Sequence, residues 1–447
     1  MKPINIGIVG LGTVGCGVVN VLHRNREEIS RRAGRDICVT HAVVRDLEKK
    51  RPPLEANFAL TSNSIDVTDN PNIDIVVELI GGVREASQLV ERALEKNKHV
   101  VTANKALIAQ RGNELFELAS SKGLTIAFEA AVGGGISIIK VLREGLAGNR
   151  IYRISGIING TSNYILTEMF NSKLDFESAL NNATNLGYAE HDPSTDISGT
   201  DAAHKLTILA SIAYGIPLKF SDVYVEGIAH ITLEDMLYAD ELNYRIKHLG
   251  LAIRTPDGIE LRTHPCLIRK DELLSNINGV MNAIQIDGDA VGPTLHYGAG
   301  AGAEPTASAI VADLVDVVRT LTTDPNNRVP HLAFQPRLMV DVPILDMKLT
   351  TTPYYLRLNV IDKPGVLADI TEILGRYDIS IEVISQKETN TQGRSVPIII
   401  ITHDAVEKSI MDAISEIEQL AAINGLVQRI RLERLSVVNK SVVQQVG

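Results

Sequence analysis

A glycine-rich turn in the first 26 residues restricts the fold of this chain more than any other feature. Residues 4–9 are an apolar run, residues 10–15 read GLGTVG, and residues 16–26 have helical spacing. This is the pattern G-x-G-x-x-G in a strand–turn–helix setting. The first glycine permits a tight turn, the second lets a pyrophosphate approach the backbone, and the third lets the helix pack on the strand.

The pattern therefore predicts a dinucleotide at the start of the helix, where free peptide N–H groups attract anions. A glycine-rich turn without a ligand is the alternative interpretation. The residues expected to face the dinucleotide are Gly10, Leu11, Gly12, Thr13, Val14 and Gly15.

Strand-like runs alternate with helical spacing through the first third of the chain. After the run at residues 4–9, strand-like runs fall at residues 37–44, 74–80, 99–101 and 124–128, and residues 85–96 have helical spacing. Such alternation predicts a parallel, doubly wound sheet, which binds ligands beyond the carboxyl ends of its strands. We expect a Rossmann-type α/β nucleotide-binding domain over residues 1–135. Lys105 follows the fourth strand-like run, residues 99–101, so we expect it to reach cofactor or substrate. An ordinary surface lysine is the alternative interpretation.

The end of the second strand indicates which dinucleotide fits. An NAD-binding protein usually has Asp or Glu there, to accept the ribose hydroxyls. Here Arg45 stands at that point and a basic run follows at residues 49–51, although Asp46 and Glu48 add negative charge. A guanidinium matches a 2′-phosphate well. We expect NADP with NAD possible; the alternative is a solvated charged turn.

Composition excludes several classes of protein. The apolar fraction of 45% and the charged fraction of 22% are those of a globular protein. A net charge of −10 argues against a nucleic-acid partner. The longest apolar runs are too short for a membrane span, and the first residues have no signal-peptide layout. Three cysteines without a paired pattern indicate a reducing compartment, so we expect a cytoplasmic protein.

Acidic residues are concentrated in the segment GYAEHDPSTDISGTDAAHKL, residues 187–206. Zinc is disfavoured, because His191 and His204 are widely spaced and no cysteine lies near. A helix that begins near Asp201 places Lys205 on the same face, one turn later. That pair is either a plain helix salt bridge or part of a site in which carboxylates hold a small zwitterion and the lysine acts as acid or base.

The glycine run at residues 129–136, EAAVGGGI, exposes backbone carbonyl groups beside one carboxylate. Carbonyl and carboxylate oxygens are ligands for a hard cation. A flexible hinge between domains is an equally good interpretation of the composition.

Longer motifs resemble those of homoserine dehydrogenases. They are GIINGTSNYIL at residues 156–166, GYAEHDPSTDISGTDAAHKLTILA at 187–210 and YGAGAGAEPTASAIVADL at 297–314. With the glycine fingerprint they follow the family's order over residues 1–330. The resemblance implies NADP(H)-dependent interconversion of L-aspartate 4-semialdehyde and L-homoserine, in threonine, methionine and isoleucine biosynthesis. It also implies an α+β catalytic domain at residues 136–330, whose last helix packs back on the nucleotide-binding domain.

The same resemblance implies roles for individual residues. Lys205 matches the proton donor to the substrate carbonyl, and Lys105 matches a lysine near nicotinamide and substrate. Substrate-binding residues are Glu190, Asp196 and Asp201, and Gly187 and Gly302 approach the cofactor. A structural sodium ion is implied at Glu129, Val132, Gly134 and Ile136. Two departures are His191, where we expect proline or a small residue, and Ala299, where a larger residue is common.

The last quarter of the chain has its own pattern. A linker at residues 331–353 contains prolines, and a strand–helix–strand–strand–helix–strand order follows over residues 354–435. This order predicts a ferredoxin-like βαββαβ unit, with its second helix at residues 405–421. The turn DKPGVLA at 362–368 resembles that of ACT domains, which bind amino acids and pair with one another. The resemblance implies an amino-acid effector, threonine first, and a homodimer or homotetramer; a module that only dimerises is the alternative.

Two other functions remain open at this level. One is a dehydrogenase for another small amino acid. The other is a non-catalytic sensor that binds a nucleotide and reports through the C-terminal module.

Overall fold

The computed structural model describes the whole chain except residues 1, 52–53, 55, 190–191, 387–394 and 436–447. The chain forms two compact units. The first is Met1–Gly160, Asp201–Val223 and Val280–Val342, and the second is Thr161–Thr200, Tyr224–Gly279 and Pro343–Gly447. None of the described helices is long and apolar enough to cross a membrane.

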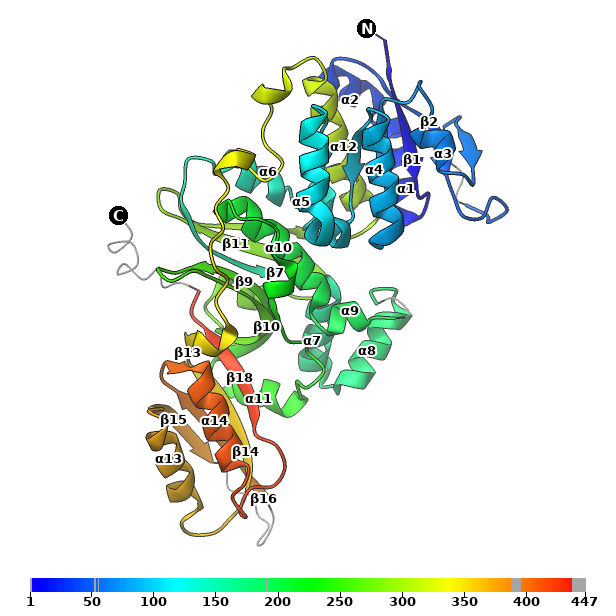
Figure 1. Ribbon diagram of the computed structural model, residues 1–447. Coiled ribbons are helices and arrows are strands. Elements are labelled where there is room, and N and C mark those ends of the chain that lie inside the picture. Colours follow the sequence, from blue (N-terminus) through cyan, green and yellow to red (C-terminus); the bar gives the residue numbers. More distant parts are fainter. Residues whose placement is uncertain (1, 52–53, 55, 190–191, 387–394, 436–447) are drawn as a thin grey trace. The chain divides into compact units, whose positions relative to one another are not determined.

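The first unit contains a six-stranded parallel sheet in the order β3-β2-β1-β4-β5-β6 (Figure 1). Its strands are β1 (Ile4–Val9), β2 (Ile37–Val43), β3 (Ala59–Thr61), β4 (Ile75–Glu78), β5 (His99–Thr102) and β6 (Ile126–Ala127). The strand order changes direction between β1 and β4, which is where doubly wound sheets bind ligands. The predicted Rossmann-type sheet is confirmed. The short strand β3 is not apparent in the sequence, because it is largely exposed and has no apolar run.

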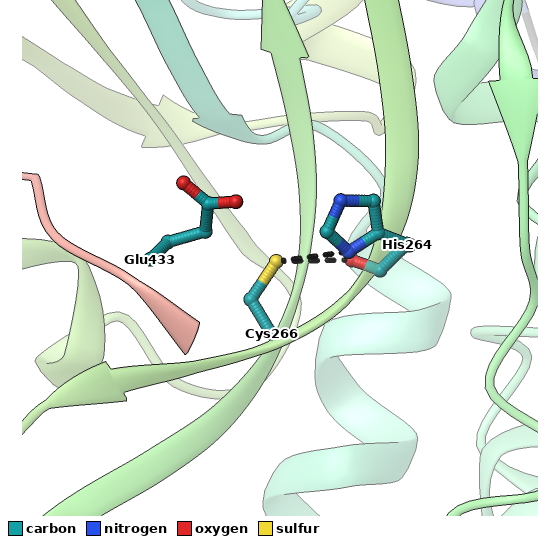
Figure 2. A group of neighbouring side chains, drawn as sticks. All are labelled: His264, Cys266 and Glu433. Carbon is teal, nitrogen blue, oxygen red and sulfur yellow. Dashed lines mark hydrogen bonds between the residues drawn. The ribbon is translucent and has the colours of Figure 1, made fainter. Parts of the chain in front are cut away.

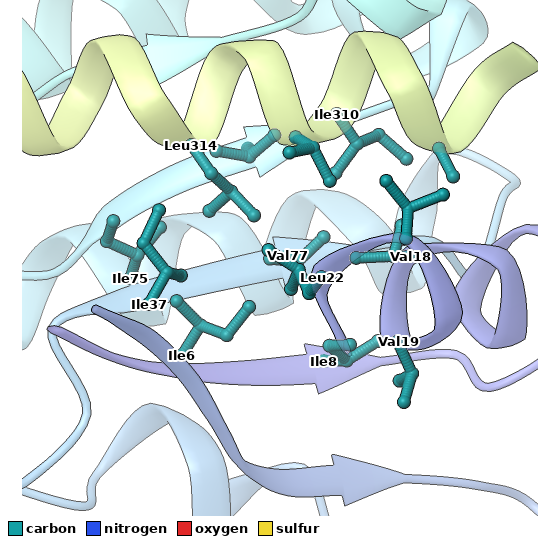
Figure 3. Close-up of a cluster of buried hydrophobic side chains, with 14 of the residues drawn as sticks. Ile6, Ile8, Val18, Val19, Leu22, Ile37, Ile75, Val77, Ile310 and Leu314 are labelled. Atoms are coloured by element: carbon teal, nitrogen blue, oxygen red, sulfur yellow. The ribbon is translucent and has the colours of Figure 1, made fainter. Parts of the chain in front are cut away.

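A helix from much later in the sequence completes the core of this sheet. Figure 3 shows α12 (Ala303–Thr320) beside α1 (Thr13–Arg24) and the strands. The buried cluster includes Ile6, Ile8, Val18, Leu22, Ile75, Val77, Ile310 and Leu314. A Cβ atom on Gly17 of α1 would lie 2.6 Å from the carbonyl oxygen of Ala303. The close approach of α1 and α12 therefore depends on a glycine.

The rest of the first unit carries a second, antiparallel sheet and a central helix. The sheet has the order β12-β11-β7, with β7 (Ile151–Ile157), β11 (Met281–Gly288) and β12 (Gly292–Ala299). In helix α10 (Thr200–Tyr214) every residue after the first is buried. An entirely buried helix can position polar side chains with little freedom.

The second unit contains a sheet in the order β9-β10-β18-β14-β16-β15. The strands are β9 (Tyr244–Arg254), β10 (Ile259–Arg269), β14 (Tyr354–Ile361), β15 (Ile381–Gln386), β16 (Ser395–Thr402) and β18 (Gln428–Glu433). The last four strands, with α13 (Val366–Arg376) and α14 (Glu407–Ile417), form the predicted ferredoxin-like module, which is confirmed. The second helix is shorter than predicted, because Ala405–Val406 pair as a short strand, β17.

The sheet of the ferredoxin-like module carries buried side chains on both of its faces. One face packs on α13 and α14 through a cluster that includes Leu356, Ile370 and Ile410. On the other face Tyr355, Ile399 and Ile401 belong to a separate cluster. That cluster also contains residues of α7 (Gly160–Ser172), α8 (Phe176–Asn185) and α11 (Leu233–Glu241). The module therefore shares a hydrophobic core with helices of the middle part of the chain.

Candidate active site

Two lysines meet on one buried carboxylate, that of Asp201. Its Oδ1 lies 3.0 Å from Nζ of Lys105, and its Oδ2 lies 2.6 Å from Nζ of Lys205. The amide of Asn159 donates a hydrogen bond of 2.8 Å to the same Oδ2. Lys205 also donates to the carbonyl oxygen of Ile158 at 2.8 Å. The fold thus joins three of the residues that the sequence singled out.

Local structure explains the positions of Asp201, Lys205 and Lys105. Gly199 has a φ of +86°, in the region that favours glycine, and turns the chain just before α10. Asp201 lies in the first turn of α10, where the helix dipole favours a carboxylate, and Lys205 follows one turn later. The side chain of Asn104 caps α5 (Lys105–Ser121), so Lys105 is the first residue of that helix.

The electrostatics of the cluster favour an oxygen that gains negative charge. Burial raises the pKa of Asp201, but the ammonium groups of Lys205 and Lys105 outweigh burial and hold that pKa well below its usual range. With Asp201 ionised, the three side chains of Lys105, Asp201 and Lys205 together carry one net positive charge. The Lys205 side chain is 11% exposed and that of Lys105 is 42% exposed. Lys205 is therefore the shielded cation of the cluster, and Lys105 is the more accessible one.

A row of polar residues supports Lys105, and it was missed in the sequence. Glu78 is fully buried at the end of β4 and accepts hydrogen bonds from N–H of Ile80 and from the hydroxyl of Thr102. Thr102 in turn accepts the backbone N–H of Asn104, and the Asn104 amide donates to the carbonyl oxygen of Gly82. The signal available in the sequence was a glutamate at the end of an otherwise apolar strand.

The glycine fingerprint opens into a groove of about 1460 Å³. Gly10, Leu11, Gly12, Thr13 and Arg45 line it, together with Asp46, Lys49, Lys50 and Arg51. Gly10 has a φ of +106°. A Cβ on Gly15 would lie 2.3 Å from the carbonyl oxygen of Gly10, whereas one on Gly12 would meet nothing within 4 Å.

Each glycine therefore has the geometry that the fingerprint requires. Val14 and Gly15 do not line the groove, and Gly15 acts through packing. The side chain of Arg45 is 86% exposed, and its Nη2 lies 3.7 Å from Oε2 of Glu85.

Known proteins match this chain along its length. Family models match at residues 10–129 (homoserine dehydrogenase, NAD binding domain), 138–315 (homoserine dehydrogenase) and 354–419 (ACT domain). A homoserine dehydrogenase of Pseudomonas aeruginosa is 56% identical over 98% of this chain and 100% of its own. The crystal structure of one from Thiobacillus denitrificans is 58% identical, covers 97% of this chain and 99% of its own, and has a TM-score of 0.93. The chain belongs to the homoserine dehydrogenase family.

A more distant member of the family is known with a nucleotide. The structure of a hyperthermophilic archaeal homoserine dehydrogenase in complex with NADPH is 28% identical and has a TM-score of 0.59. It covers 71% of this chain and 98% of its own. The family assignment makes this chain an oxidoreductase with a nucleotide-binding domain and an ACT domain.

Other residues expected to function in a homoserine dehydrogenase are placed as follows. Gly302 caps α12 with a φ of +128° in the first unit, and Gly187 has a φ of +74° in the second. Asp196, in α9 (Ser194–Ile197), belongs to the second unit, where its carbonyl oxygen accepts the hydroxyl of Ser162. Glu190 and its neighbour His191 lie outside the described residues.

The turn with the predicted cation ligands is buried. The carboxylate of Glu129 accepts the N–H groups of Ile139 and Lys140, and its own N–H donates to Asp313. Burial raises the pKa of Glu129 to about 7, and burial beside Glu129 raises that of Asp313 to about 8. The two buried carboxyl groups would be stabilised in their ionised forms by a cation.

The backbone of this turn offers further oxygens to a cation. Gly133 and Gly134 both have positive φ, and the carbonyl oxygen of Ile136 accepts the N–H of Ile138. The carbonyl oxygens of Val132 and Gly134 accept no hydrogen bond from the part of the chain that the structure describes. Because both residues are buried, a cation would satisfy groups that otherwise lack a partner. The donor set of carbonyl and carboxylate oxygens fits a hard cation.

A second cluster, His264, Cys266 and Glu433, contains residue types that bind metals, but another interaction accounts for it. Figure 2 shows His264 and Cys266 of β10 beside Glu433 of β18. The guanidinium of Arg262, itself buried, forms an ion pair with Glu433 and lies 2.8 Å from Nε2 of His264. A guanidinium already neutralises the carboxylate and would repel a cation. We therefore assign this cluster to the pairing of β10 with β18.

Proposed function

We propose that this chain interconverts L-aspartate 4-semialdehyde and L-homoserine and that Lys205 moves the proton. The observation that carries the proposal is the Lys105–Asp201–Lys205 cluster, in a chain of the homoserine dehydrogenase family. A shielded ammonium beside a second cation is suited to an aldehyde oxygen that becomes an alcohol.

In the direction of homoserine the nicotinamide supplies the hydride for the aldehyde carbon. Lys205 donates a proton to the aldehyde oxygen, so the C=O bond becomes C–O–H and the lysine becomes a neutral amine. In the opposite direction the neutral amine accepts the hydroxyl proton. Asp201 holds both lysines in place, and Lys105 stabilises charge on the same oxygen. We assign Asp196 and Glu190 to binding the polar groups of the amino acid.

NADP is the dinucleotide that we propose, with NAD as a weaker alternative. Arg45, Lys49, Lys50 and Arg51 all line one groove. This basic segment favours a cofactor with an additional phosphate group, although carboxylates such as Asp46 and Glu85 also line the groove. The archaeal relative was solved with NADPH.

A structural sodium ion is proposed at Glu129, Val132, Gly134 and Ile136. The support is the pair of buried carbonyl groups beside two buried carboxyl groups. We expect a higher melting temperature in sodium chloride than in the chloride of a bulky organic cation at equal ionic strength. Equal melting temperatures would remove the ion from the proposal.

The C-terminal module is proposed to bind an amino-acid effector, with threonine first, and to regulate the enzyme in threonine, methionine and isoleucine biosynthesis. Gly365 caps α13 with a φ of +96°, and nothing lies within 4 Å of a Cβ placed on it. The ACT family match covers this turn. A cytoplasmic homodimer or homotetramer remains our prediction, and the three free cysteines agree with a reducing compartment.

The function is tested by NADPH oxidation on adding aspartate semialdehyde, with the wild type, Lys205→Ala and Lys122→Ala. Lys122 is an exposed lysine at the end of α5. Loss of the proton donor should lower kcat by about a hundred- to ten-thousandfold with little change in NADPH affinity. Lys122→Ala should match the wild type. Near-normal turnover in Lys205→Ala would remove the assigned role. A wild type that turns over only another amino-acid aldehyde, or that binds NADPH without turnover, would favour the two alternative functions.

A further inference from the structure

Lys247 in the second unit is a buried cation whose hydrogen-bond partners among the described residues are all neutral. The residue lies in β9 and is 3% exposed. Its ammonium donates to three neutral oxygens: Oδ1 of Asn163 at 3.3 Å, Oδ1 of Asn278 at 3.0 Å, and the carbonyl oxygen of Ile277. Among the described residues no carboxylate forms an ion pair with it. These hydrogen bonds satisfy its protons but leave its charge uncompensated, which is costly away from water.

A small cavity adjoins this lysine. Its volume is about 130 Å³. Its lining, as far as the structure describes it, contains two cations, Lys247 and Arg245, and no carboxylate. The remaining polar lining is hydroxyl and amide groups, including Asn171 and Asn276. The Asn171 side chain forms no hydrogen bond with the described residues. The cavity therefore offers positive charge and neutral hydrogen-bond donors together.

Neighbouring side chains add to the positive charge around the cavity. Asp240 is shared between Arg245 and Lys270. The ring of Phe170, which lines the cavity, has the Arg245 guanidinium 4.2 Å from its centroid and the Lys173 ammonium at the same distance. Arg245 and Lys270 thus share one carboxylate, and neither Lys173 nor Lys247 forms an ion pair with a carboxylate of the described residues. Burial and the neighbouring Arg245 lower the pKa of Lys247 to about 7, as expected for a lysine without an anion.

We propose that this cavity binds a small oxyanion, a carboxylate or an inorganic phosphate, against Lys247 and Arg245. An oxyanion would replace the neutral Oδ1 of Asn278 as a partner of the ammonium and would supply the missing negative charge. Asn276 and Asn278 are exposed, so the cavity can be reached from solvent. A cavity of this volume admits a molecule no larger than a small amino acid.

The site is placed where an occupant would contact several functional elements. Its walls include α7, α11 and β9. The helices α7 and α11 also pack on the C-terminal module, and Ser162 of α7 holds the backbone of Asp196. Binding in this cavity is a property of the second unit alone and does not depend on the proposed catalytic roles.

The test uses the full-length protein with the nucleotide groove saturated by NADPH, because phosphate would also enter that groove. Binding of phosphate and of acetate, each compared with chloride at equal ionic strength, is measured by calorimetry and by the shift in melting temperature. Lys247→Met removes the charge but keeps the side-chain length. Lys173→Met is the matched control, since Lys173 contacts the same Phe170 ring but does not line the cavity.

We expect saturable binding to the wild type and to Lys173→Met, and binding at least about tenfold weaker to Lys247→Met, because a charge-assisted hydrogen bond is lost. Asn276→Asp provides a second variant should Lys247→Met not fold. It places a carboxylate on the exposed cavity wall, so it should also abolish anion binding. Binding that is equal in all variants, or no ion-specific binding to the wild type, would overturn the proposal. The acetate and phosphate arms separate a carboxylate site from a phosphate site.

Discussion

At the scale of single residues, Asp201 joins the side chains of the proposed active site. Its carboxylate is shared by Lys105 and Lys205, and the amide of Asn159 donates a hydrogen bond to it. Without it, two ammonium groups would repel each other in a buried setting. The carboxylate therefore allows two cations to lie close together, with Lys205 shielded and Lys105 more exposed.

The choice of cofactor also depends on single side chains. Arg45→Ala should weaken NADPH binding by at least about tenfold more than NADH binding, since an exposed guanidinium in the groove is the natural partner of a 2′-phosphate. Dissociation constants for both cofactors measure the difference. Lys122→Ala, outside the groove, should change neither constant. Equal losses for NADPH and NADH would show that Arg45 does not contact the phosphate.

At the scale of elements, two glycines of the first helix region have separable roles. A Cβ on Gly12 would have no atom within 4 Å, whereas a Cβ on Gly17 would lie 2.6 Å from the carbonyl oxygen of Ala303 in α12. Gly12→Ala should leave stability unchanged and weaken cofactor binding, because a methyl group would occupy the space that a pyrophosphate approaches. Gly17→Ala should push α12 from α1 and destabilise the protein by about 1–3 kcal/mol.

Melting curves with and without NADPH distinguish the two glycine variants. The expected pattern is a normal melting temperature with a reduced NADPH shift for Gly12→Ala, and a lower melting temperature for Gly17→Ala. If Gly12→Ala keeps the full NADPH shift, the nucleotide does not approach that turn.

A half-buried histidine ties the segment after α12 to β6 and makes stability depend on pH. Nε2 of His331 accepts the N–H of Ile126, and its ring stacks on Phe116. Burial lowers the pKa of His331 from 6.5 to about 3. Below pH 6.5 the unfolded chain takes up a proton that the folded chain does not, so stability falls as the pH drops from 6.5 towards 3. The cost is about 1.4 kcal/mol per unit of pKa difference.

His331→Gln keeps an acceptor for Ile126 but cannot be protonated. Its melting temperature should therefore depend less on pH between 6.5 and 4 than that of the wild type. His403→Gln, at an exposed position, should retain the wild-type dependence. Identical pH curves for all three proteins would mean that His331 does not govern acid stability.

At the scale of the whole molecule, the C-terminal module is part of the core of the second unit. Tyr355, Ile399 and Ile401 pack with Ile165 and Met236 of the middle segment. Arg357 of β14 adds an ion pair with the fully buried Asp235 of α11, at 2.6 Å. Removing the residues after about 345 would expose this surface. A truncated enzyme is therefore expected to unfold or aggregate, and truncation cannot separate regulation from catalysis.

Regulation is better tested in the intact enzyme. We expect threonine to bind and to lower the reaction rate, which requires unequal affinity for two states of the protein. Arg357→Lys keeps the charge but loses the planar fork that holds Asp235, so inhibition should weaken while threonine binding remains. Arg376→Met, which removes an exposed ion pair inside the module, should leave inhibition unchanged. If no amino acid alters the rate of the wild type, the module is an assembly device.

The sequence by itself determined those features that depend on local periodicity and on short motifs. The glycine fingerprint and alternating runs predicted the doubly wound sheet, and a βαββαβ order predicted the ferredoxin-like module. The i, i+4 spacing placed Asp201 and Lys205 together, because helix geometry relates residues one turn apart. In the nucleotide-binding sheet and the ferredoxin-like module, the strands missed or misjudged, β3 and β17, are two or three residues long and have no periodic pattern. The strands β7 and β9 to β12 of the middle part were not predicted from the sequence.

Contacts between distant segments were decided only by the tertiary structure. Lys105 reaches Asp201 from another helix, and the row from Glu78 to Asn104 is assembled by two neighbouring strand ends. Lys247 is an ordinary lysine in the sequence, and only the fold shows that it is buried without an anion. Burial and charge pairing depend on what other segments place around a side chain, and a linear pattern carries no record of those neighbours.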